Sequence, residues 1–271
     1  LPEMALGRIA SFCVTEPGAG SDAASLRSRA EKVDGGYRLT GEKIWVTNGH
    51  HADYYVVMAR TSDDGARGIS AFLVERGAEG LQIGAKEDKM GLRSSDAISL
   101  VLDGVVVSEE NRIGDEGEGF KIAMSALDGG RIGVAYQALG IAEACLDVGA
   151  RYALEREQFG KPIAKLQAVQ WHLAEMATEL EMATLLADKA AWLKDNGKPY
   201  GKQAAMAKLA CSEVAGRCAD KALQIHGGFG YSKDYDVERY YRDVRVTRIY
   251  EGTSEIQKLV IARKVLDEFG G

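Results

Sequence analysis

The hydrophobic pattern of this chain changes its period once, and that change limits the folds open to it. Up to about residue 107, short apolar runs rich in β-branched and aromatic residues are separated by turn signals such as Asn48-Gly49. After residue 119, apolar residues recur every three or four positions over long stretches. The pattern predicts an α+β protein with a β domain at 1–108 and a helical domain at 109–271, joined where charges and glycines cluster.

The first domain is predicted to contain only strands and turns. The expected strands cover residues 9–15, 37–39, 44–47, 54–59, 69–74 and 98–107. Because no helical pattern lies between these runs, they predict a small antiparallel β-barrel or sheet.

The second domain is predicted to be a four-helix bundle with mostly short connections. Its first apolar seam runs from Phe120 to Tyr152, and its second runs from Leu166 to Ala190 and ends before Asn196-Gly197. A third helix, rich in small residues, is expected near 202–225. A segment near 235–249 then crosses before the last helix.

Composition excludes several classes of function. The 34 basic and 40 acidic residues are interspersed, with a net charge of -6, so neither a nucleic-acid surface nor a membrane surface is expected. No charge-free stretch approaches the roughly 18 apolar residues of a membrane span, which predicts a soluble protein. The four cysteines have no C-x-x-C spacing, which favours reduced thiols in an intracellular protein. The four histidines have no ligand spacing, so no metal site is predicted.

The segment Tyr250-Glu251-Gly252-Thr253 precedes the last helix. Thr253 or Ser254 is placed to cap that helix, so Glu251 is expected in the turn before it. A carboxylate there can act as a general base if apolar surroundings raise its pKa, and Gly252 allows the backbone to approach a ligand. The alternative is an ordinary acid near a helix N-terminus, favoured by the helix dipole.

Arg131 occupies a core-facing position on the first helical seam. An unpaired charge there is costly, so Arg131 must meet a carboxylate or a bound anion. An internal ion pair with Asp128, three residues earlier, is the competing interpretation.

Four other segments are weak signals when each is taken alone. A Gly-rich loop at 12–22 can direct backbone N–H groups at an anion, and Trp45 is either a stacking surface or a core residue. The segments at 156–162 and 224–230 each have the composition of a helix end followed by a turn.

Together, however, five segments in this order resemble the FAD-dependent acyl-CoA dehydrogenases. They are residues 15–22, 45–49, 156–160, 224–228 and 250–253, and the resemblance runs through essentially all 271 residues. The stretches 251–257 and 128–133 are most similar to the short-chain, butyryl-CoA type.

The resemblance implies roles for particular residues. Glu251 is the implied base, and Gly130 stands where the isovaleryl type carries its own glutamate. The implied FAD contacts are Phe12, Val14, Thr15, Ser21, Trp45, Val46, Thr47, Arg156, Phe159, Gln167, Gln224, Gly227, Gly228, Thr253 and Glu255. The implied acyl-CoA contacts are Ser21, Asp128, Arg131 and Gly252.

The resemblance also implies a reaction and partners. The expected activity is α,β-dehydrogenation of a short-chain acyl-CoA to trans-2-enoyl-CoA, with electrons passed to an electron-transfer flavoprotein. A homotetramer is expected, in the cytoplasm of a bacterium or the mitochondrial matrix of a eukaryote. Family members usually carry a further N-terminal helical domain, so a fragment or a trimmed subunit is expected. A flavin-dependent acyl-CoA oxidase and a non-catalytic flavin-binding subunit are the alternatives.

Overall fold

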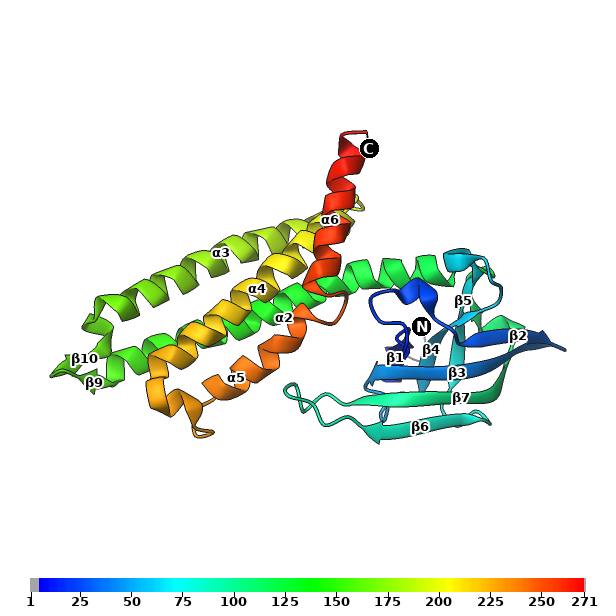
Figure 1. Ribbon diagram of the computed structural model, residues 1–271, viewed down its shortest axis with the longest axis horizontal. Helices are drawn as coiled ribbons and strands as arrows, with labels where there is room; N and C mark the ends of the chain where they lie inside the picture. Colours follow the sequence, from blue (N-terminus) through cyan, green and yellow to red (C-terminus); the bar gives the residue numbers. More distant parts are fainter. Residues whose placement is uncertain (1–4, 271) are drawn as a thin grey trace. The chain divides into compact units, whose positions relative to one another are not determined.

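The computed structural model describes residues 5–270 and contains two compact units. The first unit comprises residues up to 89 together with 93–126, and the second comprises 90–92 and the residues from 127 onward. Strands lie in the first unit and long helices in the second, which confirms the prediction of an α+β protein (Figure 1). The predicted domain boundary after residue 108 stays a prediction.

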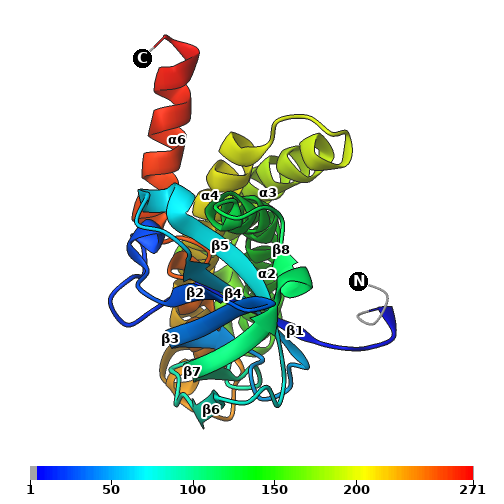
Figure 2. The same cartoon turned by 90° about the vertical axis from the view of Figure 1, so that its right-hand side faces the viewer.

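One sheet of eight strands organises the first unit (Figure 2). Along the sheet the order is β6-β7-β3-β2-β4-β5-β8, and β1 pairs with β4 beside this path. The strands are β1 (Ala10–Cys13), β2 (Arg29–Val33), β3 (Gly36–Thr47), β4 (Tyr54–Arg60), β5 (Ile69–Glu75), β6 (Leu81–Lys86), β7 (Ala97–Ser108) and β8 (Arg112–Ile113).

The pairing within this sheet differs from the prediction in two ways. The sheet is mixed rather than wholly antiparallel, because β4 pairs in parallel with β1 and with Arg29 of β2. Parallel pairing needs a long connection, and the loop and strands between β1 and β4 supply one. The runs expected at 37–39 and 44–47 form one strand, β3, whose pairing with β7 shifts register at Leu39/Thr40 and again between Lys43 and Val46. Closure into a barrel stays a prediction.

Two apolar clusters stabilise the first unit. The larger one contains fully buried side chains of the central strands, including Tyr55, Phe72 and Leu100. The smaller one is built on Leu26 and Met58, and the partly buried side chains that pack against it include those of Phe12 and Val14. The start of the loop at 12–22 is therefore anchored by apolar packing.

The second unit contains the long helices that the periodicity predicts. They are α2 (Gly119–Glu155), α3 (Gln167–Asp195), α4 (Gly201–His226), α5 (Val237–Val244) and α6 (Ser254–Glu268), with a short hairpin of β9 (Glu157–Gln158) and β10 (Lys161–Pro162) between α2 and α3. The first turns of α2 belong to the first unit. α3 ends at Asp195, and Gly197 beyond it has a positive φ of 64°, as expected for a helix C-terminus.

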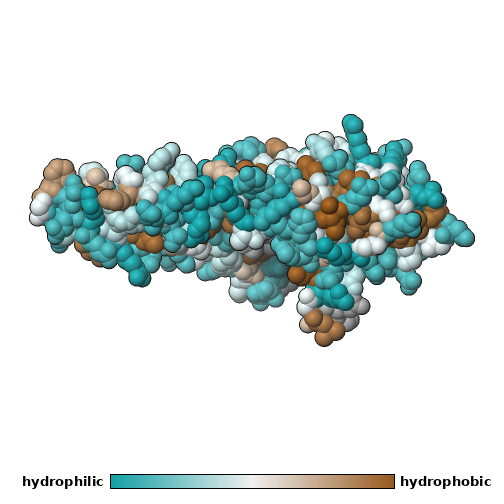
Figure 3. Space-filling view, turned by 90° about the horizontal axis from the view of Figure 1, so that it is seen from below, coloured by the Kyte–Doolittle hydropathy of each residue, from teal (hydrophilic) through white to brown (hydrophobic). Residues whose placement is uncertain are grey.

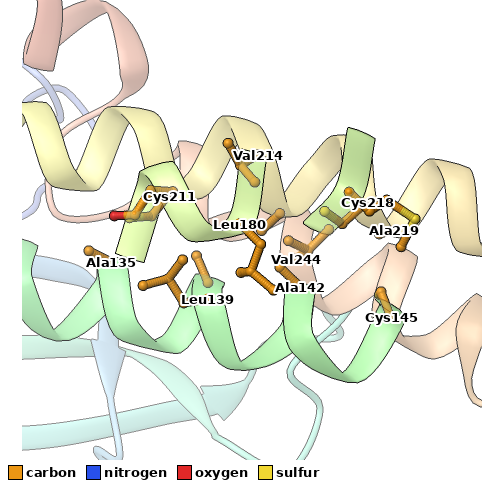
Figure 4. Packing of buried hydrophobic residues seen from close by; sticks show 14 of the residues in the cluster. Ala135, Leu139, Ala142, Cys145, Leu180, Cys211, Val214, Cys218, Ala219 and Val244 are labelled. Atoms are coloured by element: carbon orange, nitrogen blue, oxygen red, sulfur yellow. The ribbon is translucent and has the colours of Figure 1, made fainter. Parts of the chain in front are cut away.

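Small side chains fill the core of the second unit. Figure 4 shows Ala135 and Ala142 of α2 close to Cys211 and Cys218 of α4, with Leu180 of α3 nearby. Such residues allow helix axes to approach closely. On α6, in contrast, Leu259 and Leu266 are exposed, as is Phe269 just after its end, whereas Ser254 and Gln257 are buried. The four-helix bundle therefore stays a prediction.

The helix α2 meets the length and composition of a membrane span, alone among the helices of residues 5–270. A core helix passes the same test, and the α2 residues Ala138 and Cys145 are fully buried in the helical core. On the face shown in Figure 3, hydrophilic residues predominate and hydrophobic residues form separate small groups.

Candidate active site

Glu251 lies in a tight turn immediately before α6, as predicted. Its φ is +54°, a value that few residues other than glycine adopt, and φ of Gly252 is +89°. Thr253 then caps α6, because its side-chain oxygen accepts a hydrogen bond from the backbone N–H of Ile256 at 3.4 Å. The two positive φ values place the Glu251 side chain outside the helix.

Three side chains hold the backbone carbonyls of this turn. Gln257 Nε2 donates to the carbonyl oxygens of Glu251 and Gly252, at 3.1 and 2.8 Å. Lys208 Nζ donates to the Gly252 carbonyl at 2.7 Å, and Arg131 Nε donates to the Glu251 carbonyl at 3.4 Å. Because Lys208 and Gln257 are fully buried, these bonds form away from solvent and fix the strained turn.

The surroundings of the Glu251 carboxyl raise its pKa, which favours a role as proton acceptor. Burial raises its pKa, and the nearby charges of Arg131 and Lys208 oppose that rise without cancelling it. Among the ion pairs within residues 5–270, none involves this carboxylate, so its oxygens remain available. A carboxylate with a raised pKa is the better general base near neutral pH.

Gly130 of α2 faces this carboxylate directly. A Cβ atom at residue 130 would lie 2.9 Å from Glu251 Oε2, closer than real contacts allow. The absence of a side chain at residue 130 therefore gives the Glu251 carboxylate its room. Gly130 is also the position at which, by the resemblance, the isovaleryl type carries its own glutamate.

Arg131 forms the internal ion pair that the sequence left open. Its buried guanidinium lies 2.5 Å from Asp128 Oδ1, one turn earlier on α2. Asp128 also lies near the N-terminus of α4, because a Cβ atom at Gly201 would be 3.1 Å from Asp128 Oδ2. A role for either residue in binding acyl-CoA stays a prediction.

Sequence reasoning missed Lys208 and Gln257. Burial lowers the pKa of Lys208 to about 8, with the charge of Arg131 acting in the same direction. Lys208 falls on the same helix face as buried Ala204, Cys211 and Ser212, so the spacing that singled out Arg131 was also available here. Gln257 gave no comparable signal.

A pocket lies where α2 and α4 end, away from Glu251. It is a pocket of about 470 Å³ lined by Tyr152, Arg156, Gln158, Ile163, Ile225, His226, Gly227, Gly228 and Phe229. The Arg156 guanidinium lies 5.1 Å from the centre of the Phe229 ring, and His226 stacks on Tyr152 at 4.1 Å. Three predicted FAD contacts, Arg156, Gly227 and Gly228, are thus brought together.

The remaining predicted contacts of the second unit do not line this pocket. The Phe159 side chain is 88% exposed at the hairpin, with a φ of +54°. Gln167 and Gln224 are also exposed, and Glu255 projects from the first turn of α6. A role for these four residues in binding FAD stays a prediction.

In the first unit, a buried ion pair anchors the loop at 12–22. Lys43 Nζ of β3 lies 2.7 Å from Glu16 Oε1, and it also donates to the Val14 carbonyl at 3.3 Å. The Glu16 carboxylate further accepts hydrogen bonds from the backbone N–H groups of Arg27 and Ser28, at 2.6 and 3.0 Å. Sequence reasoning missed this pair, which fixes the loop to the sheet.

The predicted flavin contacts of the first unit differ in accessibility. Ser21 and Thr47 are exposed, and Phe12, Val14 and Thr15 are partly buried. Trp45 is 55% exposed with a φ of +57° at the second register shift of β3, so the core interpretation of Trp45 is wrong. Val46 is fully buried. An exposed indole at a rigid bulge is suited to stacking.

Comparisons with known proteins agree with these features. Residues 11–105 match the family model for the acyl-CoA dehydrogenase middle domain, and residues 117–266 match the model for the C-terminal domain. The chain is 49% identical to acryloyl-CoA reductase (NADH) of Anaerotignum propionicum, over 96% of this chain and 67% of that protein. It is 50% identical to the mitochondrial short-chain specific acyl-CoA dehydrogenase of Rattus norvegicus, over 97% of this chain and 64% of that protein.

A solved structure gives the same result. Butyryl-CoA dehydrogenase from Megasphaera elsdenii superposes with a TM-score of 0.95 at 48% identity, covering 96% of this chain and 68% of that one. Across the curated relatives, the chain spans 62% to 71% of their length. The chain belongs to the acyl-CoA dehydrogenase family.

Proposed function

We propose that this chain forms the middle and C-terminal domains of an FAD-dependent acyl-CoA dehydrogenase acting on short-chain acyl-CoA. The observation that carries the proposal is Glu251: a half-buried carboxylate with a raised pKa, on a turn held by three side chains and facing a glycine. The identity to short-chain relatives supports the substrate class.

The residues present suit FAD. The pocket at Arg156 and Phe229 combines a cation with aromatic surface, and a Cβ atom at Gly227 or Gly228 would meet nothing within 4 Å, so a ligand can approach the backbone. These groups match a nucleotide and its phosphates. In the first unit, exposed Trp45 and the anchored loop that carries Thr15 and Ser21 suit a planar ring. FAD, when bound, accepts the β-hydrogen of the substrate as hydride.

The role of this chain's own residues follows from the acidity of the substrate. An α-proton beside a thioester is only weakly acidic, so its removal needs a positioned base. Glu251 takes that proton, and loss of hydride from the β-carbon leaves trans-2-enoyl-CoA. Gly252 would lie against the thioester. Arg131, which is paired with Asp128, donates to the Glu251 carbonyl and so helps to hold the turn that carries the base.

The similarity to an acryloyl-CoA reductase favours a second candidate, the reverse reaction. A carboxyl group with a raised pKa also serves as an acid, so Glu251 would then donate its proton to the α-carbon of an enoyl-CoA. The electron partner decides the direction. For dehydrogenation, we propose an electron-transfer flavoprotein as partner and a homotetramer as the assembly.

Anaerobic titration of the FAD-loaded protein with acyl-CoAs of increasing chain length tests the proposal. We expect butyryl-CoA to bleach the flavin and to yield one enoyl-CoA per flavin, with weaker response to long chains. In air, an oxidase would release one hydrogen peroxide per product. A flavoprotein that no acyl-CoA bleaches and no enoyl-CoA reoxidises would be a non-catalytic subunit, and the proposal would fail.

A further inference from the structure

Within residues 5–270, Lys208 is a fully buried lysine that forms no ion pair with an acidic side chain, and such a lysine is unusual enough to need a reason. Lys208 on α4 is 0% exposed, and its ammonium group donates a hydrogen bond to the Gly252 carbonyl at 2.7 Å rather than to a carboxylate. Buried ammonium groups are normally paired. The placement of Lys208 therefore carries a cost in stability, which the turn at Glu251 explains.

We propose that Lys208 is a positioning residue for the base: it fixes the Gly252 carbonyl and supplies a buried positive charge that favours ionised Glu251. This inference rests on the proposed role of Glu251. It adds a residue on α4 to a turn otherwise held by Arg131 of α2 and Gln257 of α6.

Lys208 has two parts to this role: it holds a carbonyl of the turn, and it supplies positive charge. Gln257 spans both carbonyls of the turn, whereas Lys208 bonds only that of Gly252. Gln257 is neutral, so the buried positive charge comes from Lys208 and Arg131. Arg131 is already paired with Asp128, 2.5 Å away, whereas Lys208 has no ion pair in the part of the chain that the structure describes.

The charged groups around Lys208 come from every element packed near it. Arg131 of α2 lowers the pKa of Lys208, after burial as the main cause, and Glu251, Glu213 of α4 and Glu255 of α6 oppose that shift. Glu213 is engaged by Arg248 at 3.1 Å and by Ser254 at 2.9 Å. With a pKa of about 8, Lys208 carries its positive charge at pH values below about 8.

The test compares two lysines of the same helix. Lys208→Met removes the charge and the donor, and Lys221→Met makes the same change at a lysine that pairs with Glu175 at 2.7 Å, away from the turn. Reduction of the flavin by butyryl-CoA is followed anaerobically in the full-length, FAD-loaded protein from about pH 5 to about pH 9.

For Lys208→Met, we expect the acidic limb of the rate profile to move upward by about one pH unit, and the plateau rate to fall about 10-fold. Lys208→Arg keeps the charge and should leave the limb in place. Lys221→Met should match the wild type. A folded, FAD-loaded Lys208→Met variant with a wild-type profile overturns the inference.

A second measurement covers the case in which Lys208→Met does not fold. Coupling between two titrating groups is reciprocal, so removing the charge of Glu251 must lower the pKa of Lys208. NMR of ¹³Cε-labelled lysine in the Glu251→Gln variant reads this directly, and an unchanged Lys208 pKa overturns the inference. If Glu251→Gln reduces its flavin at the wild-type rate, the proposed function fails instead, whatever the Lys208 result.

Discussion

Two buried lysines of this chain have opposite relations to a glutamate. Lys43, in the first unit, contacts Glu16 at 2.7 Å, and this contact with the neighbouring hydrogen bonds outweighs burial and lowers the pKa of Glu16. Lys208, in the second unit, bonds a backbone carbonyl instead, and burial dominates to raise the pKa of Glu251. A lysine in direct contact with a carboxylate thus keeps that carboxylate ionised and fixed in the structure. A lysine that bonds a backbone carbonyl nearby instead leaves the carboxylate with a raised pKa, so that it can take up a proton.

The strongest expected effect on stability comes from breaking the pair in the first unit. Lys43→Met leaves Glu16 buried without its partner and should lower the free energy of unfolding by about 3–5 kcal/mol. Chemical denaturation measures the loss. Lys121→Met is the control: Lys121, on α2, forms an exposed pair with Glu118, and its loss should cost less than about 1 kcal/mol.

The double variant Glu16→Gln/Lys43→Met sharpens this prediction, because it removes both charges of the buried pair. We expect the double variant to recover much of the lost stability. If Lys43→Met is no more damaging than Lys121→Met, the pair does not anchor the loop.

A methyl group opposite Glu251 should have the next largest effect, on rate rather than stability. In Gly130→Ala, the new Cβ atom would lie 2.9 Å from Glu251 Oε2, too close for an ordinary contact, so the carboxylate must move. We expect flavin reduction to slow by about 10- to 100-fold. Stability should rise by up to about 1 kcal/mol, because alanine favours the helix.

Gly133→Ala is the matched control for this substitution. Gly133 lies three residues later on α2, and a Cβ atom there would meet nothing within 4 Å. Equal rates for the two alanine variants would show that Gly130 does not provide room for the base.

The smallest expected effects are opposite pH dependences of stability. The Glu16 pKa is lower in the folded protein than the usual 4.5, so its contribution is present above about pH 4.5 and is lost as the pH falls through the folded value. The Glu251 pKa is raised, so its contribution is present below about pH 4.5 and is lost as the pH rises through the folded value.

Denaturation at several pH values distinguishes the two contributions. The stability difference between wild type and Glu16→Gln should grow with pH, and that between wild type and Glu251→Gln should shrink. Each unit of pKa difference is worth about 1.4 kcal/mol. If both stability differences changed with pH in the same direction, the contrast between the two glutamates, and so between the two lysines, would be lost.

The sequence predicted the helical unit better than the sheet or the buried charges. The seams ending at Tyr152 and Ala190 lie in α2 and α3 because the period of 3.6 residues repeats many times in a long helix. The strands β2 and β6 were missed, because their outward positions are polar and their runs are short. The register shift that exposes Trp45 depends on pairing with β7, which local sequence does not encode.

Buried lysines are hard to predict for a physical reason. Lysine is usually exposed, so Lys43 and Lys208 were assigned no role, although Lys208 has the spacing of a buried position. Their partners are distant in sequence: Glu16 is 27 residues from Lys43, and Gly252 is 44 residues from Lys208. Only the fold brings these groups together.

Exchange of the substrate α-proton with deuterated water tests the central claim most directly, because it isolates the step assigned to Glu251. An acyl-CoA analogue with sulfur in place of the β-carbon cannot lose hydride, so any exchange reports proton removal alone. We predict that the FAD-loaded wild-type protein exchanges this proton and that Glu251→Gln exchanges it about 10²- to 10⁴-fold more slowly. Exchange at the wild-type rate in Glu251→Gln would contradict the account.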